Sequence, residues 1–257
     1  MKVEAVELHR VGMPLVRPFE TSFGRQTERD VLLLRVRTDG SEGWGECVAM
    51  TDPVYSSEYV DGCAAVLERY LVPAVLSAPE LTADGFAGLV RGILGHRMAK
   101  AALEAALLDA ELRSAGTSLA RRLGAVRDEV DCGVSVGIAP GIPELLEEVA
   151  GYVAEGYRRI KLKIKPGWDL EPVAAVRAAL PAGFPLQVDA NTAYALEHVD
   201  RLRGLDEFDL LLIEQPFPEE DVGAHAVLAS RIRTPVCLDE SITDAVVAAD
   251  AVDRGAT

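Results

Sequence analysis

Residues 158–189 read RRIKLKIKPGWDLEPVAAVRAALPAGFPLQVD, and this stretch decides the fold. Its two ends, residues 158–164 and 186–188, have the composition of strands, while residues 170–180 have helical spacing. A strand, a helix and a second strand in this order indicate a parallel βαβ unit, because parallel neighbours need a long crossover connection.

The same order repeats toward both ends of this stretch. We expect strands at 132–138, 158–164, 186–188, 210–213 and 236–238, and helices at 143–155, 170–180, 198–204, 222–231 and 244–254. Most of these strands are nearly continuous apolar runs, as in sheets whose two faces are both covered. The fold class is therefore α/β in this half of the chain.

Polar residues follow four of these strands at a nearly constant interval. Lys163 is followed by Asp189 26 residues later, and Glu214 and Asp239 come at further steps of 25. In a βα barrel the carboxyl ends of all strands converge on one face, whereas a doubly wound sheet would spread these side chains along an edge. We therefore predict a barrel with the four side chains around one pocket.

The first part of the chain has a different pattern. Pro14 and Pro18 predict a loop, and residues 31–36 and 43–47 predict two strands of an antiparallel meander. Helical spacing follows over residues 56–113, with a separate run from residue 98 to 112. We predict an α+β capping domain over residues 1–125 and a barrel domain over residues 126–257.

Composition excludes several classes of protein. The 257 residues are 49% hydrophobic and 26% charged, as in globular proteins, and the net charge of −15 makes a nucleic acid an unfavourable partner. Apolar runs are far shorter than the roughly 20 residues of a membrane span, and no signal peptide is visible, so we expect a cytoplasmic protein without a membrane partner. The four cysteines form no C-x-x-C pair and are expected to be buried free thiols.

Three carboxylates gathered in one pocket repel each other unless their pKa values rise or a cation lies between them. Mg²⁺ prefers oxygen ligands, so Asp189, Glu214 and Asp239 are candidate metal ligands, with Mn²⁺ as another suitable divalent ion. Asn191 and Glu240 lie beside them and are expected to orient them. The alternative is that each acid caps a helix or pairs with an arginine.

Three of the five lysines lie in the stretch Ile160-Lys-Leu-Lys-Ile-Lys165. On a strand, alternate residues share a face, so these lysines are expected to point into the barrel. A lysine crowded by another cation can become a neutral amine, which makes Lys163 a candidate general base and Lys161 its electrostatic partner. The alternative is an exposed edge strand that lysines protect from pairing.

Four motifs together resemble the muconate-lactonising subgroup of the enolase superfamily, and more closely its o-succinylbenzoate synthases that also racemise N-acylamino acids. The motifs are Lys161-Leu-Lys163, Val-Asp189-Ala-Asn191, Ile-Glu214-Gln-Pro and Leu-Asp239-Glu240-Ser. Further similar stretches are Gly43-Trp-Gly-Glu-Cys47, Tyr55-Ser-Ser-Glu-Tyr59, Gly95-His-Arg-Met-Ala-Lys100 and Cys132-Gly-Val-Ser-Val-Gly137.

The resemblance implies Lys163 as base, Lys161 as its partner, and Asp189, Glu214 and Asp239 as Mg²⁺ ligands, with Glu240 in contact with them. A lysine base with Mg²⁺ is the known pairing in this superfamily. The residues implied to line the substrate pocket are Phe19, Phe23, Met50, Tyr55, Ser135 and Asn191. Lys165 lies outside the pattern and is expected to be solvated.

The implied activity is removal of a proton next to the carboxylate of a small molecule. It would be a dehydration to o-succinylbenzoate in menaquinone biosynthesis, with racemisation of N-acylamino acids as a second activity, in a full-length form that is a homo-oligomer. Dipeptide epimerases and muconate cycloisomerases are alternatives in the same superfamily. A non-catalytic binding module is the alternative from another class.

One feature of the resembling family has no counterpart here. A second catalytic lysine is expected on a sixth barrel strand, which the register places after residue 257. We therefore expect residues 1–257 to contain the first five βα units of an incomplete enolase-type barrel. We expect this chain alone to be inactive and prone to aggregate, because unpaired strand edges stay open.

Overall fold

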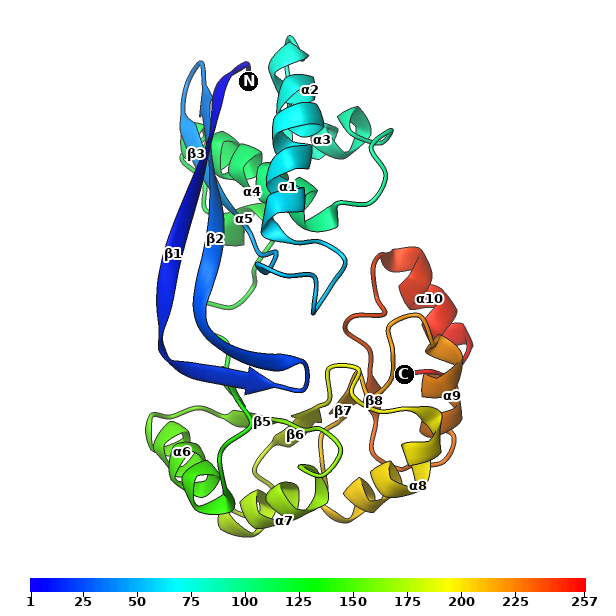
Figure 1. Ribbon diagram of the computed structural model, residues 1–257. Coiled ribbons are helices and arrows are strands. Elements are labelled where there is room, and N and C mark those ends of the chain that lie inside the picture. Colours follow the sequence, from blue (N-terminus) through cyan, green and yellow to red (C-terminus); the bar gives the residue numbers. More distant parts are fainter. The chain divides into compact units, whose positions relative to one another are not determined.

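The computed structural model describes residues 1–257, which divide into two compact units. Unit 1 contains Met1–Pro18 and Thr27–Asp128, and unit 2 contains Phe19–Gln26 and Glu129–Thr257. We expected a single boundary after residue 125. The structure instead groups Phe19–Gln26, the tip of a long hairpin, with the second half of the chain (Figure 1).

Unit 1 contains most of a three-stranded sheet in the order β1-β2-β3. Its strands are β1 (Val3–Thr21), β2 (Gly24–Thr38) and β3 (Glu42–Cys47). The loop predicted from Pro14 and Pro18 is wrong, because both prolines lie inside β1. A residue without a backbone N–H is tolerated there because β1 is an edge strand.

Helices complete unit 1. They are α1 (Val60–Val66), the π-helical turn η1 (Leu67–Leu71), α2 (Val72–Ser77), α3 (Ala83–Leu89), α4 (Arg97–Ser114) and α5 (Leu119–Arg122). The long helix α4 packs directly on β3, where Gly43 and Gly45 leave room for its backbone. Leu34, Leu67 and Leu103 are fully buried in the core between these elements.

Unit 2 alternates strands and helices as predicted. Its elements are β4 (Gly133–Val136), α6 (Ile142–Ala154), β5 (Arg159–Lys163), α7 (Leu170–Ala179), β6 (Leu186–Asp189), η2 (Leu196–His198), α8 (Val199–Leu202), η3 (Arg203–Glu207), β7 (Ile213–Glu214), α9 (Val222–Ala229), β8 (Val236–Cys237) and α10 (Ala245–Asp253). The five strands are parallel and pair in chain order, from β4 to β8. The strand expected at 210–213 is shorter than predicted, because pairing begins only at Ile213.

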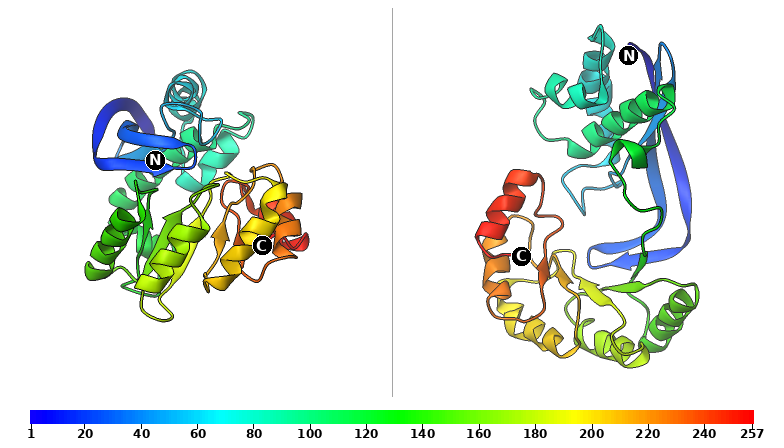
Figure 2. Two further views of the ribbon diagram at one scale, coloured as in Figure 1. Left: turned by 60° about the horizontal axis from the view of Figure 1, so that its bottom comes forward. Right: turned by 180° about the vertical axis from the view of Figure 1, so that it is seen from behind.

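The helices of unit 2 all lie on the same side of the curved sheet (Figure 2). Ile160 and Leu162 of β5 are buried in the core on that side. Strand residues alternate between faces, so the lysines of β5 point to the side without helices. A doubly wound sheet carries helices on both faces, so the arrangement is of the barrel kind.

The four cysteines are all free thiols, as expected, but only Cys47 and Cys63 are fully buried. Cys237 is half-buried, and the expectation is wrong for Cys132, which is exposed because it precedes β4 outside either core. None of the helices combines the length and the apolar character that crossing a membrane requires.

Candidate active site

The register of the sheet in unit 2 arranges polar side chains in two rows. The first row runs across β5 to β8 and contains Lys163, Asp189, Glu214 and Cys237. The second row lies two residues earlier and contains Ser135, Lys161 and Gln187. Residues paired across parallel strands share a face, as do residues two apart on a strand, so both rows point away from the helices.

Lys163 lies in the middle of a polar cluster, and its side chain is only 10% exposed. Its Nζ atom donates to Asp189 Oδ2 and to Asn191 Oδ1, both at 2.6 Å. Lys161 bridges two acids, with Nζ 3.0 Å from Asp189 Oδ2 and 3.1 Å from Glu214 Oε1. The exposed-edge alternative for these lysines does not describe β5, which lies between β4 and β6.

The two neighbouring acids have opposite pKa shifts. Burial raises the pKa of Asp189, but Lys163 and Lys161 lower it by more, and the pKa lies below its usual range. The pKa of Glu214 is raised by burial and by the negative charge of Asp189, against the opposing effect of Lys161. For Lys161 burial acts in the other direction and lowers the pKa, but the carboxylates of Asp189 and Glu214 raise it by more, so the pKa of Lys161 lies above its usual value.

Asn191 and Glu240 extend the cluster from Lys163. Asn191 accepts from Lys163 and donates through Nδ2 to Glu240 Oε1 at 3.0 Å. Its backbone has a φ of 40°, a left-handed conformation that asparagine tolerates better than most residues. Glu240 Oε2 and Ser135 Oγ are both buried without a hydrogen-bond partner, and burial raises the pKa of Glu240.

The cluster fits a hard divalent ion in its chemistry but not in its present spacing. Asp189 and Glu214 are buried while Asp239, two residues beyond Cys237, is exposed, and all three supply oxygen atoms. No three His, Cys, Asp or Glu side chains converge at ligand distances, and Lys161 lies between Asp189 and Glu214. The Oε2 atom of Glu240 is buried without a hydrogen-bond partner, and an ion or its water ligands would supply one.

The hairpin tip in unit 2 contacts the loops that follow β4 to β6. Ser22 Oγ donates to the backbone oxygen of Asn191 at 3.1 Å, and Ile138 N donates to Glu20 O at 2.9 Å. Lys165 forms an ion pair with Glu20 at 3.2 Å, and its side chain is 37% exposed, so it is partly solvated as predicted. The tip thus lies beside the expected metal site.

The predicted substrate-contacting residues fall in both units. Phe19 and Phe23 belong to the hairpin tip in unit 2, where Phe19 lies near Gly137 just after β4. Met50 and Tyr55 belong to unit 1, in the segment between β3 and α1. Met50 pairs with Tyr59 there through an isolated bridge, and its contact with a substrate stays a prediction.

Comparison with known proteins assigns both parts of the chain. Residues 4–124 match the N-terminal domain of mandelate racemase and muconate-lactonising enzymes, and residues 144–257 match the enolase C-terminal domain-like family. An N-succinylamino acid racemase of an Amycolatopsis species is 60% identical over 256 residues, which is 100% of this chain and 70% of that protein. The chain belongs to the enolase superfamily, in the group of o-succinylbenzoate synthases and N-succinylamino acid racemases.

Other members of this enolase-superfamily group support the assignment. An o-succinylbenzoate synthase of Geobacillus kaustophilus is 44% identical over 99% of this chain and 68% of its own length. The crystal structure of an enolase-superfamily protein from Listeria innocua superposes with a TM-score of 0.93, at 35% identity, over 100% of this chain and 69% of that one. The family predicted from the motifs is therefore confirmed, as is an α/β fold with a capping domain and a parallel sheet.

Two glutamines in this enolase-superfamily site were not predicted from the sequence. Gln187 donates to Glu214 Oε2 at 3.3 Å. It lies two residues before Asp189 on the same strand, so strand alternation could have predicted that it shares the face of Asp189. Gln215 is fully buried and hydrogen-bonds to the loop after β8. Nothing in the sequence around Gln215 indicates those partners.

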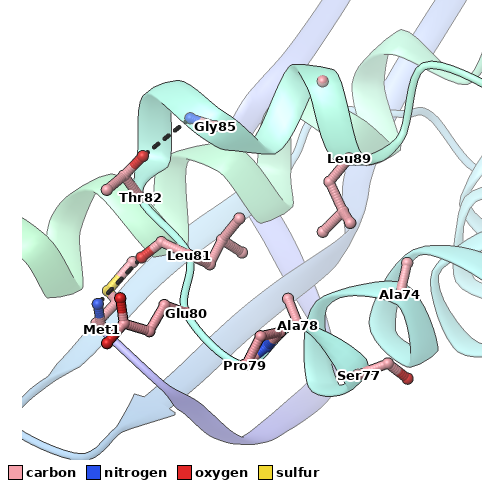
Figure 3. Close-up of a pocket in the computed structure, with 11 residues that line it drawn as sticks. Met1, Ala74, Ser77, Ala78, Pro79, Glu80, Leu81, Thr82, Gly85 and Leu89 are labelled. Atoms are coloured by element: carbon pink, nitrogen blue, oxygen red, sulfur yellow. Dashed lines mark hydrogen bonds between the residues drawn. The ribbon is translucent and has the colours of Figure 1, made fainter.

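A pocket of about 870 Å³ lies apart from these residues, within unit 1 (Figure 3). Its lining comes from α2, α3, the segment between them and Met1, whose amino group donates to Leu81 O at 3.1 Å. Glu80 is the only charged side chain in this lining. With a single charged side chain in its lining, we assign the pocket no chemistry.

Proposed function

We propose that the protein abstracts a proton next to the carboxylate of a small-molecule substrate, with Lys163 as the base. The observation that carries this proposal is the row formed by Lys163, Asp189 and Glu214, which places an amine among buried acids on one face of the sheet. Buried charged side chains without function are costly, so such a row is typical of a reaction site rather than of packing. This argument also weighs against a non-catalytic binding module.

Asp189, Glu214 and Asp239 would hold a divalent ion, Mg²⁺ or Mn²⁺, with Glu240 and Asn191 orienting them. When bound, the ion supplies positive charge that stabilises the substrate carboxylate as it gains electron density. An ion held by these acids would replace the contacts of Lys161 with Asp189 and Glu214, and the Lys161 ammonium group would then be available to the substrate anion. Lys163 would lose its contact with Asp189 as well, and it would act as the base only after its ammonium group has released a proton to solvent.

The substrate side of the site would include Ser135 and the phenylalanines of the hairpin tip in unit 2. Ser135 supports this best, because it is paired with Lys161 in the second row and its hydroxyl is buried without a partner. A substrate oxygen at this position would satisfy that hydroxyl. The roles of Met50 and Tyr55 in substrate contact stay predictions.

We infer that the reaction is the dehydration that forms o-succinylbenzoate in menaquinone biosynthesis, with racemisation of N-acylamino acids at the same site. The relatives at 60% and 44% identity bear the names of both activities. Dipeptide epimerisation and muconate cycloisomerisation are alternatives that start from the same carbanion chemistry. A homo-oligomeric assembly and a cytoplasmic location stay predictions.

The test is exchange of the substrate α-proton in D₂O, which NMR follows on an N-succinylamino acid with the full-length protein. We expect Mg²⁺-dependent exchange that falls by about 10²–10⁴-fold in Lys163→Met, the usual contribution of a general base. Lys165→Met is the matched control, because Lys165 ends the same lysine stretch but pairs with Glu20. Exchange without Mg²⁺, or native exchange in Lys163→Met, would overturn the proposal.

A further inference from the structure

The sheet ends before it reaches the third proposed metal ligand. Strands β7 and β8 contain two residues each and end at Glu214 and Cys237. The backbone bond from Gln215 N to Cys237 O, at 2.9 Å, is the last of this ladder. Asp239 lies two residues farther along, where strand pairing does not fix its position relative to Glu214.

The side chain of Gln215 forms hydrogen bonds to the loop after β8, beyond the last backbone hydrogen bond between β7 and β8. Its Oε1 atom accepts from the backbone N–H groups of Asp239, at 2.8 Å, and of Ser241, at 3.2 Å. Its Nε2 atom donates to Ser241 Oγ at 2.7 Å and to Phe217 O at 3.1 Å. The orientation of the amide is thereby determined, because a flipped amide would face its donors toward two N–H groups.

Gln215 also has an unfavourable backbone conformation. Its φ of 37° is in the left-handed region, which is strained for a non-glycine residue. The surroundings hold it there, since Gln215 O accepts from Thr192 N at 2.8 Å in the loop after β6. One fully buried residue therefore connects the loops that follow β6, β7 and β8.

We propose that Gln215 is a positioning residue that sets the separation of the Glu214 and Asp239 carboxylates. It acts through the backbone of Asp239, and its amide is fully engaged with protein atoms, so it has no need to touch ion or substrate. This inference rests on the proposed function of the two acids as metal ligands. Glycine or asparagine would adopt the same φ more easily, but neither reaches the Asp239 N–H group.

The experiment compares native protein with Gln215→Met, which keeps the length of the side chain and removes its hydrogen bonds. Mn²⁺ affinity is measured by electron paramagnetic resonance, and amide hydrogen exchange is measured at Asp239 and Ser241. We expect Mn²⁺ affinity to fall by about 10–100-fold, as for other residues that orient metal ligands, and exchange at both amides to accelerate.

Thr234→Val is the matched control. Thr234 is buried at the opposite end of the β8 segment, where its Oγ1 donates to Asp206 Oδ1 at 2.9 Å. This variant loses a buried hydrogen bond beside the same strand, and we expect lower stability with native Mn²⁺ affinity. If Gln215→Met does not fold, Gln215→Asn keeps the amide but is one methylene too short, and it should lower the affinity in the same direction.

The outcomes separate this inference from the proposed function. Native Mn²⁺ affinity in the Gln215 variants, or an equal loss in Thr234→Val, would overturn the positioning role and leave the metal site standing. Absence of Mn²⁺ binding to the native protein would overturn the metal site and the positioning role together.

Discussion

At the scale of single residues, the number of lysine contacts separates the two buried acids. Asp189 contacts both Lys161 and Lys163, whereas Glu214 contacts only Lys161. Burial raises the pKa of both acids. The two lysines lower the pKa of Asp189 by more than burial raises it, whereas the negative charge of Asp189 adds to burial at Glu214, whose pKa stays raised despite Lys161. Glu214 is therefore the acid whose protonation competes with a bound cation.

Mn²⁺ affinity should consequently depend on pH through Glu214. Below its raised pKa the carboxyl is protonated and must release a proton before it can bind an ion, so we expect the affinity to decline at a higher pH than for an ordinary glutamate. Calorimetric titration between about pH 4.5 and 8 measures this decline. Glu214→Gln is the comparison, with weaker binding and a flatter profile; an equally steep profile in this variant would assign the proton to another group.

The sequence could predict those parts of the site whose positions follow from the alternation of residues along a strand. Alternation along residues 160–165 and the 25-residue interval predicted that Lys163, Asp189 and Glu214 would share one face, and the sheet register places them there. The pairing of Lys165 with Glu20 joins positions 145 residues apart, and the partners of Gln215 are backbone groups of another loop. No sequence pattern describes contacts of this kind.

At the scale of elements, the contact between β3 and α4 in unit 1 depends on two glycines. A Cβ atom on Gly45 would overlap the carbonyl oxygen of Ala102, and one on Gly43 would overlap the backbone at Ala106 and Ala110. The strand and the helix therefore meet backbone to backbone. This explains why two glycines, which usually weaken a strand, occur in the strand predicted over residues 43–47.

Gly45→Ala should destabilise unit 1 by about 1–3 kcal/mol or more, because the added methyl group forces the backbone of α4 away from β3. Urea unfolding followed by circular dichroism measures the change. Gly88→Ala in α3 is the control, since nothing lies within 4 Å of its Cβ position. That variant should be neutral or gain up to about 1 kcal/mol from helix propensity. Equal stability of Gly45→Ala and native protein would contradict the close approach.

Element boundaries were less predictable than element types. The strand-helix alternation of unit 2 follows from periodicity, but the break at Pro14 and Pro18 did not occur, because a free strand edge needs no N–H from proline. The short helix α3 lies inside the helical region predicted over residues 56–113 but was not distinguished as a separate helix. Its N-cap at Thr82, which accepts from Gly85 N, is a signal of only a few residues.

At the scale of the whole molecule, each unit has its own buried core. The charged site residues on the sheet strands all belong to unit 2. The net charge of the protein is −15, so a bound cation would reduce the repulsion among its acidic side chains. A bound ion that requires the folded arrangement of β6, β7 and β8 must stabilise that arrangement.

Mg²⁺ should therefore raise the melting temperature. At an Mg²⁺ concentration about 100 times the Kd, the gain is about 2.7 kcal/mol, or several degrees for a protein of this size. Differential scanning calorimetry with and without EDTA measures the shift. Asp189→Asn should lose most of it, while Asp109→Asn should keep it, because Asp109 lies in unit 1, where it bonds to Arg113 and to Trp44 N. A shift retained in Asp189→Asn would locate the bound ion elsewhere.

The two rows on the sheet have a consequence for insertions and deletions. Removing one residue inside β6 would rotate Asp189 and Gln187 toward the helices and turn Val188 toward the lysines, so a single step would dismantle the cluster. Removing one residue from the turn before β6 leaves that alternation intact. We therefore expect that insertions and deletions among natural sequences of this type occur in the turns at the ends of the strands and not inside them.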